Sequence, residues 1–207
     1  RGKTLRAVRS FKEFLKFMLA FLIYNDGILM ILDFGAILGA ILYGMEQQEL
    51  IIFMILVQLA SVAGAYLFGL MANDFGSKRS LILSLLLTMV PVVWLYFSSS
   101  RLEFYLIGAL VGFALTGVQS VSRSMVAAFA PPGQSAEFYG FFAVAGRTSS
   151  FIGPTVFGFV AAWSTRRYMA EGLLEEAAKV EGHLTALVTI IAFLLAGLVL
   201  LFWVNEK

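Results

Sequence analysis

Six apolar runs, each about 20 residues long or longer, follow one another along this 207-residue chain. A helix needs roughly 20 mostly apolar residues to cross the hydrocarbon core of a bilayer. The runs are too long for the strands of a membrane barrel and lack the alternating pattern of such strands. We therefore predict an all-α integral membrane protein with six transmembrane helices. These helices are expected over residues 14–43, 49–72, 80–99, 104–130, 138–163 and 184–204.

The composition supports the same class and excludes several functions. The chain is 60% hydrophobic and only 14% charged, whereas a soluble domain is about a quarter charged. It has no cysteine and one histidine, which excludes disulfides, thiol nucleophiles and zinc sites built from cysteine or several histidines. No cluster has catalytic spacing and no basic tract is interleaved with aromatics. We therefore expect no enzyme, no cofactor, no metal and no nucleic-acid partner.

The distribution of the fifteen lysine and arginine residues predicts the orientation in the membrane. Ten of them fall in the N-terminal segment, the loop after residue 72, the end of the fourth run and the C-terminal tail. Four fall on the other side, and Arg147 lies inside the fifth run. Because cytoplasmic loops carry the excess of positive charge, both termini are predicted to be cytoplasmic. Residues 1–13 then form a basic cytoplasmic lead-in to a single bundle that comprises residues 1–207.

The first apolar run contains the stretch "FLIYNDGILMILDFGAI", residues 21–37, which has two acidic residues in an otherwise apolar sequence. Asp26 and Asp33 are seven residues apart and share one helix face. Gly35 and Gly39 project to the opposite face, where small residues allow helices to pack closely. In the fourth run, small and polar side chains again form stripes along the helix. They comprise the packing pair Gly108 and Gly112 and a polar stripe that includes Gln119 or Ser120.

Depth in the membrane suggests a partner for one of the two acids. At about 1.5 Å per residue, Asp26 lies roughly 15 Å and Arg147 roughly 13 Å from the same membrane surface. A charge near the bilayer centre costs about 2.5–3.5 kcal/mol unless it meets water or an opposite charge. We therefore expect Asp26 and Arg147 to face one cavity and to pair. The pair is either purely structural or binds substrate or a coupling ion, and Asn25 beside it is a further candidate. Asp33 lacks a partner and is a candidate for proton uptake.

The loop between the second and third runs reads "GLMANDFGSKRSLI", residues 69–82. It resembles the loop signature of the major facilitator superfamily. The matching residues are Gly69, Ala72, Phe75, Gly76, Lys78 and Arg79. Asn73 stands where the signature has an acid, and Asp74 follows it. The resemblance implies a gating loop that clamps adjacent helices in the outward-open state.

A second stretch narrows the resemblance to the vacuole-effluxer, autophagy-type permease branch of that superfamily. It includes "YNDG" in the first run and continues across the fourth and fifth runs. The matching residues there are Gln119, Ser122, Arg123, Ser124, Pro131, Glu137, Phe138, Tyr139, Gly140, Gly146 and Arg147. The resemblance implies the C-terminal half of a twelve-helix transporter, with two three-helix units of inverted topology. The chain is then expected to be part of a longer protein.

The family resemblance implies a secondary active transporter that exports a small polar solute by alternating access, with amino acids as substrates of fungal vacuolar members. Such a half requires lipid, a solute and a second six-helix half from the same gene, a partner chain or a second copy. The alternative is a non-transporting subunit of the same fold that acts as a scaffold or assembly factor in a larger membrane complex. Asn73 and the half-size chain leave this alternative open. The expected location is the inner membrane of a bacterium.

Overall fold

The computed structural model describes residues 2–205, with side chains from Ser10 onward. The described residues form seven α-helices: α1 (Gly2–Tyr43), α2 (Gln47–Phe75), α3 (Ser77–Phe97), α4 (Arg101–Phe129), α5 (Ser135–Thr148), α6 (Ile152–Ala170) and α7 (Glu175–Phe202). Several basic residues that predict the orientation lie outside this description. They are Arg1 and Lys207, and the side chains of Lys3, Arg6 and Arg9.

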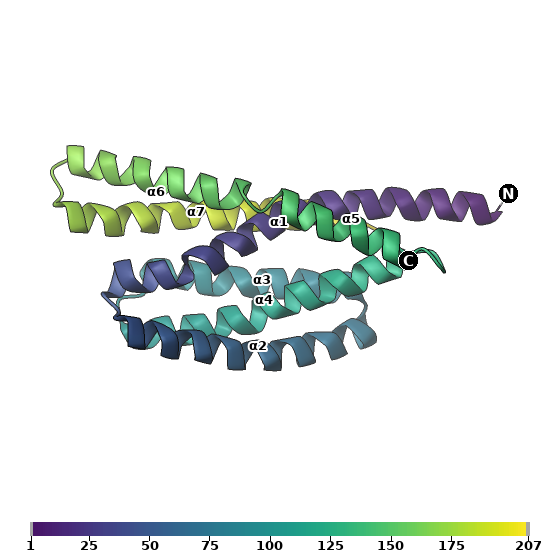
Figure 1. The fold of residues 1–207 in the computed structure, drawn as a ribbon, viewed down its shortest axis with the longest axis horizontal. Coiled ribbons are helices and arrows are strands. Elements are labelled where there is room, and N and C mark those ends of the chain that lie inside the picture. The colour runs from purple at the N-terminus through teal and green to yellow at the C-terminus, as the bar shows by residue number, and fades with distance from the viewer. Residues whose placement is uncertain (1, 206–207) are drawn as a thin grey trace.

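The helices run roughly along the long axis of the molecule (Figure 1). α1 begins and α7 ends at the same, right-hand end of the view, while the α1–α2, α3–α4 and α6–α7 turns lie at the left-hand end. α1 crosses the bundle obliquely, from the layer of α5, α6 and α7 towards the layer of α2 and α4. This oblique crossing leaves α1 close to α2 only near the turn that joins them.

Five of the described helices are long and apolar enough to cross a membrane. They are Ser10–Tyr43 of α1 and the whole of α2, α3, α4 and α7. The prediction of one continuous helix over 138–163 is wrong, because α5 ends at Thr148 and α6 begins at Ile152. The lead-in continues the helix of α1, and α7 begins at Glu175, earlier than the predicted residue 184.

α2 and α4 approach each other to backbone contact through glycines. A Cβ atom on Gly112 would meet the carbonyl of Val57, and one on Gly64 would meet the backbone of Phe113. On Gly108 it would meet the ring of Phe53. Small residues at membrane helix interfaces permit this approach. Because lipid is as apolar as the side chains, the association of the two helices is stabilised by close van der Waals packing rather than by the hydrophobic effect.

The two glycines of α1 that were predicted to pack closely, Gly35 and Gly39, lie in different surroundings. A Cβ atom on Gly39 would come within 2.9 Å of the side chains of Phe104 and Leu50, so this glycine lies at a tight contact. Around Gly35 nothing lies within 4 Å of such an atom. Gly35 therefore makes no close packing contact among the described residues.

One arginine holds the α1–α2 turn against the start of α4. Arg101 donates from Nε to the carbonyl of Tyr43 and from Nη2 to the carbonyl of Gly44, both at 3.1 Å. Its Nη1 lies 2.6 Å from the Glu49 carboxylate in the first turn of α2. A cation at the C-terminus of one helix and an acid at the N-terminus of the next both suit the helix dipoles. The three helices are therefore joined at this end of the bundle.

A second set of contacts holds the C-terminal end of α7 at the opposite end. Lys78 of α3 donates from Nζ to the carbonyls of Val204 at 2.6 Å and Phe202 at 3.0 Å. The buried carboxylate of Glu13 in α1 accepts from the Asn205 N–H at 2.7 Å. These contacts satisfy backbone groups that a helix end leaves open. They connect α7 to both α1 and α3.

The glycine contacts predict a contrast between two Gly→Ala substitutions. We expect Gly112→Ala to destabilise the full-length protein by about 1–3 kcal/mol, because the methyl group overpacks the α2–α4 contact. Gly158→Ala of α6 should stabilise it by up to about 1 kcal/mol, because nothing lies within 4 Å of the new atom and alanine favours helix. Thermal unfolding in detergent measures both. A Gly112→Ala variant as stable as Gly158→Ala would contradict the packing described here.

Candidate functional site

The fifth predicted crossing is interrupted at residues 149–151, between α5 and α6. The sequence before the interruption is polar, with Thr148, Ser149 and Ser150 in succession. Pro154 occupies the third position of α6, in the first turn, where its missing N–H costs no intrahelical hydrogen bond. The proline therefore begins a second helix rather than bending a continuous one.

A carboxylate from α1 lies at the N-terminus of α6. Asp26 is only 3% exposed, and its Oδ1 accepts from the backbone N–H of Gly153 at 3.3 Å. The N-cap residue of α6 is Phe151, which has no side-chain acceptor. Asp26 thus supplies from another helix the acceptor and negative charge that a helix N-terminus favours.

Gly153 is required for this approach. A Cβ atom at this position would lie 2.6 Å from the Asp26 carbonyl oxygen and 2.9 Å from the Asp26 Cβ. A larger residue would push α6 away from α1 and lengthen the hydrogen bond to the carboxylate. The sequence therefore combines an acid on α1 with a glycine and a proline in the first turn of α6.

The predicted pairing of Asp26 with Arg147 does not occur among the described residues. Arg147 lies exposed in the last turn of α5, and the four ion pairs of residues 10–205 do not include it. The interruption places Arg147 on α5, while Asp26 contacts the first turn of α6. The positive end of the α6 dipole, with its free N–H groups, takes the place of the cation.

The remaining polar candidates have different environments. Asp33 and Gln119 are exposed, whereas Asn25 is half-buried. The side chain of Asp33 forms no hydrogen bond or ion pair with another described residue. Asp33, Gln119 and Arg147 therefore lie at the surface of this bundle, available to a solute, to water or to another protein part.

Sequence reasoning missed a polar contact beside Asp26. The hydroxyl groups of Tyr24 and Ser122 lie 2.7 Å apart and are buried between α1 and α4. Ser149, in the interruption, is 4% exposed, and its Oγ has no hydrogen-bond partner in the described part of the chain. The sequence shows that these side chains are polar, but it does not show which of them meet.

The predicted gating loop is a single-residue turn at Gly76, with φ of 90°. Asn73 and Asp74 are exposed in the last turn of α2, and Arg79 is exposed at the start of α3. Gly69 has open space around it. Lys78 contacts the C-terminal end of α7, a contact that the loop signature alone does not reveal.

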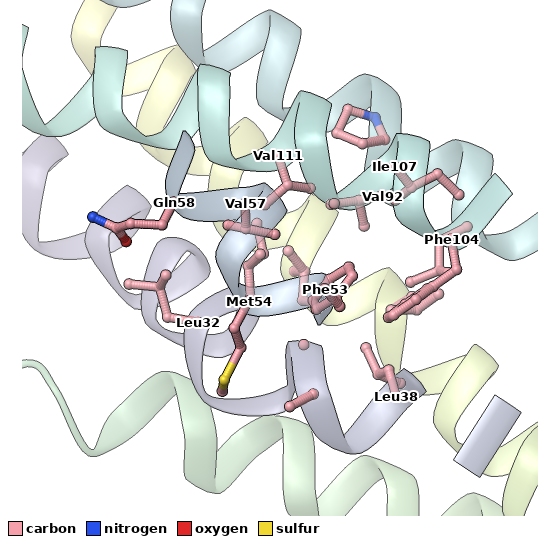
Figure 2. A pocket seen from close by; sticks show the side chains of 18 residues that line it. Leu32, Leu38, Phe53, Met54, Val57, Gln58, Val92, Phe104, Ile107 and Val111 are labelled. Carbon is pink, nitrogen blue, oxygen red and sulfur yellow. The ribbon is translucent and has the colours of Figure 1, made fainter. Parts of the chain in front are cut away.

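An apolar cavity of about 330 Å³ lies between α1, α2, α3, α4 and α7. Figure 2 shows Phe53, Met54 and Val57 of α2 together with Val92, Phe104 and Ile107 around it. Gly35 lines the same cavity, which accounts for the free space next to it. The volume falls at the lower end of the range of about 300–1,000 Å³ for ligand pockets.

No group of three or more His, Cys, Asp or Glu residues that could hold a metal ion occurs within the described residues. The polar side chains available to a ligand are therefore isolated rather than clustered.

The described residues form an all-α bundle in which five helices are long and apolar enough to cross a membrane, and these features define an α-helical integral membrane protein. The family described as "Vacuole effluxer Atg22 like" matches residues 1–168, and the chain belongs to this family. The predicted resemblance is thereby confirmed. The description of this family names an effluxer.

Two curated relatives illustrate the similarity. The chain is 28% identical over 160 residues to an uncharacterized MFS-type transporter, YxiO, of Bacillus subtilis, covering 77% of this chain and 37% of the relative. It is 26% identical over 173 residues to autophagy-related protein 22-1 of Penicillium rubens, covering 77% and 29%. The chain thus spans well under half the length of these relatives.

A solved structure has a similar fold. It is a bacterial homolog of the human lysosomal transporter Spinster, in an inward-facing and unoccupied conformation. The TM-score is 0.79 at 14% identity, and the match covers 97% of this chain and 49% of the other. At this identity the likeness concerns the fold alone.

The carboxylate at the start of α6 predicts unequal effects of substitutions on α1. We expect Asp26→Ala to lower the stability of the full-length protein by about 1–3 kcal/mol, because it leaves the Gly153 N–H buried and unpaired. Asp26→Asn keeps an acceptor oxygen and should cost less. Asp33→Asn, at an exposed position, is the matched control and should change stability little. Thermal unfolding of all three is the measurement, and equal losses for Asp26→Ala and Asp26→Asn would exclude the capping role.

Proposed function

We propose that this chain is the C-terminal six-helix half of a twelve-helix secondary transporter that exports a small solute by alternating access. In this proposal α5 and α6 together form the fifth crossing, which restores the predicted count of six. α1 to α3 and α4 to α7 are then the two three-helix units of inverted topology. A second six-helix half, from the same gene, a partner chain or a second copy, completes the solute cavity.

The observation that carries the proposal is the interrupted helix with Asp26 at the start of its second segment. Backbone that is not helical at membrane depth is tolerated only where protein buries it or where it lines a water-filled cavity. Transporters use such discontinuous helices at their solute and ion sites, because half-helix ends present unsatisfied dipoles. A scaffold that only fills a bilayer has no need of this interruption.

The exposed polar residues of the bundle are proposed to face the solute. Arg147, beside the interruption, supplies positive charge to an anionic group of the solute. Asp33 is proposed to take up the coupling proton, and Asn25 and Gln119 to form hydrogen bonds. Intramembrane ionisable residues are functional by default, since their burial is otherwise costly.

The topology follows from the distribution of basic residues. We place both termini and the loop at residues 69–79 on the cytoplasmic side of a bacterial inner membrane. On that side Lys78 holds the end of α7, so the loop is proposed to connect the movement of α3 with that of α7. Asp74 is proposed to stand in for the acid that Asn73 lacks.

Transport measurements on the full-length protein test the proposal. In liposomes with a pH gradient, we expect efflux of one or more radiolabelled amino acids. Arg147→Ala should reduce flux by about tenfold to a hundredfold, since a hydrogen bond to a charged group contributes about 1.5–3 kcal/mol. Asp33→Asn should remove the dependence on the gradient. Arg166→Ala, an exposed cation of α6 away from the interruption, is the control and should transport normally.

The alternative function gives the opposite result. A full-length protein that transports none of these solutes, and co-purifies in fixed stoichiometry with another membrane complex, is a scaffold or assembly subunit. The asparagine at position 73 is the sequence feature that favours this outcome, because the loop clamp of the superfamily uses an acid there.

A further inference from the structure

We infer that the apolar cavity between α1, α2 and α4 binds the alkyl chain of a single-chain amphiphile, and that such amphiphiles are among the transported solutes. The inference rests on the proposed transport function and specifies its solute class. It concerns a site separate from Asp26 and the α5–α6 interruption, neither of which lines this cavity.

The lining of the cavity selects an apolar ligand. Of the described residues that surround it, only Gln58 has a polar side chain. Apolar cavities in proteins stay dry, and one of about 150 Å³ binds benzene. The cavity of about 330 Å³ is roughly twice that size, and therefore has room for about a dozen carbon atoms. A small amino acid has no alkyl chain to fill this apolar lining, whereas an amphiphile buries its chain there and leaves its charged head group at the exposed Gln58.

The position of the polar group sets the direction of the ligand. In Figure 2, Gln58 lies at one end of the labelled side chains, with its amide directed away from the others, and Phe104 and Leu38 lie at the other end. The Gln58 end is near the middle of α2, whereas Phe104 belongs to the first turn of α4. A head group therefore lies at Gln58 and the chain extends towards Phe104. The volume suits one such chain.

Gly35 keeps the cavity open. It has nothing within 4 Å of an added Cβ atom and lies on the wall formed by α1. A side chain at this position enters the cavity without meeting backbone. Gly35→Leu is therefore expected to extend into the cavity and to fill part of the binding space.

Photolabelling of the full-length protein in liposomes tests the inference. The probe is dodecylphosphocholine with a diazirine at the end of its alkyl chain, and cross-linked residues are identified by mass spectrometry. We expect labels on α1 and α4 near Leu38 and Phe104, and competition by unlabelled dodecylphosphocholine. Gly35→Leu should reduce this labelling by about tenfold or more, a loss of roughly 1.4 kcal/mol in binding. Gly158→Leu, also a glycine in open space within a helix, should label normally.

Three further variants sharpen the result. The series Gly35→Ala, Gly35→Val and Gly35→Leu should lower labelling progressively as the added volume grows, which separates plugging from misfolding. Gln58→Leu should weaken binding of the probe several-fold, because it removes the amide that meets the phosphate. Efflux of the probe from the liposomes, lost in Gly35→Leu and kept in Gly158→Leu, links the cavity to transport.

Three outcomes would overturn the inference. They are labelling that is equal in Gly35→Leu and the wild type, labelling by a two-chain phosphatidylcholine probe at the same residues, and probe efflux that Gly35→Leu leaves unchanged. Failure of the proposed function is distinguishable from these. A wild-type protein that transports no solute but labels at Leu38 and Phe104 contradicts transport and leaves the binding site in place.

Discussion

Hydrocarbon offers no hydrogen-bond partner, so every backbone group freed where a membrane helix is interrupted must find one inside the protein. In the crossing that we propose for α5 and α6, that requirement falls on the first turn of α6, where the N-cap residue is phenylalanine. The Asp26 carboxylate meets the requirement from α1, and Gly153 permits the close approach. The acid that is costly as an isolated charge is thus stabilised by the helix end that lacks a cap. Each feature explains the presence of the other.

The same contact influences the rest of the bundle. With α1 held against α6 at Asp26 and against α4 at Gly39, the helix must cross obliquely between two layers (Figure 1). Close glycine packing brings α4 to α2 along their length. A gap therefore remains where α1 diverges from α2, and the apolar cavity occupies it. The cavity is a consequence of two tight contacts that flank it.

The sequence predicted the helical membrane class and the family well, because span length, loop charge and local motifs are all properties of neighbouring residues. It did not predict the partner of Asp26. The reasoning from depth chose Arg147 on the assumption of one continuous helix, although the polar residues 148–150 before Gly153 and Pro154 indicated an interruption. Asp26 and Gly153 are 127 residues apart, and their contact depends on the relative placement of two helices. Gly35 and Gly39 likewise share a pattern but differ in environment, since the crossing angle of α1 is not encoded in their spacing.

Arg101 has a consequence for how the cavity fills. By holding the carbonyls of Tyr43 and Gly44 and the carboxylate of Glu49, it closes the gap between α1 and α2 at the Phe104 end. The cavity is therefore closed at the Phe104 end and open towards the exposed Gln58. An amphiphile bound with its tail towards Phe104 and its head group at Gln58 therefore enters tail first and leaves head first, through the same opening.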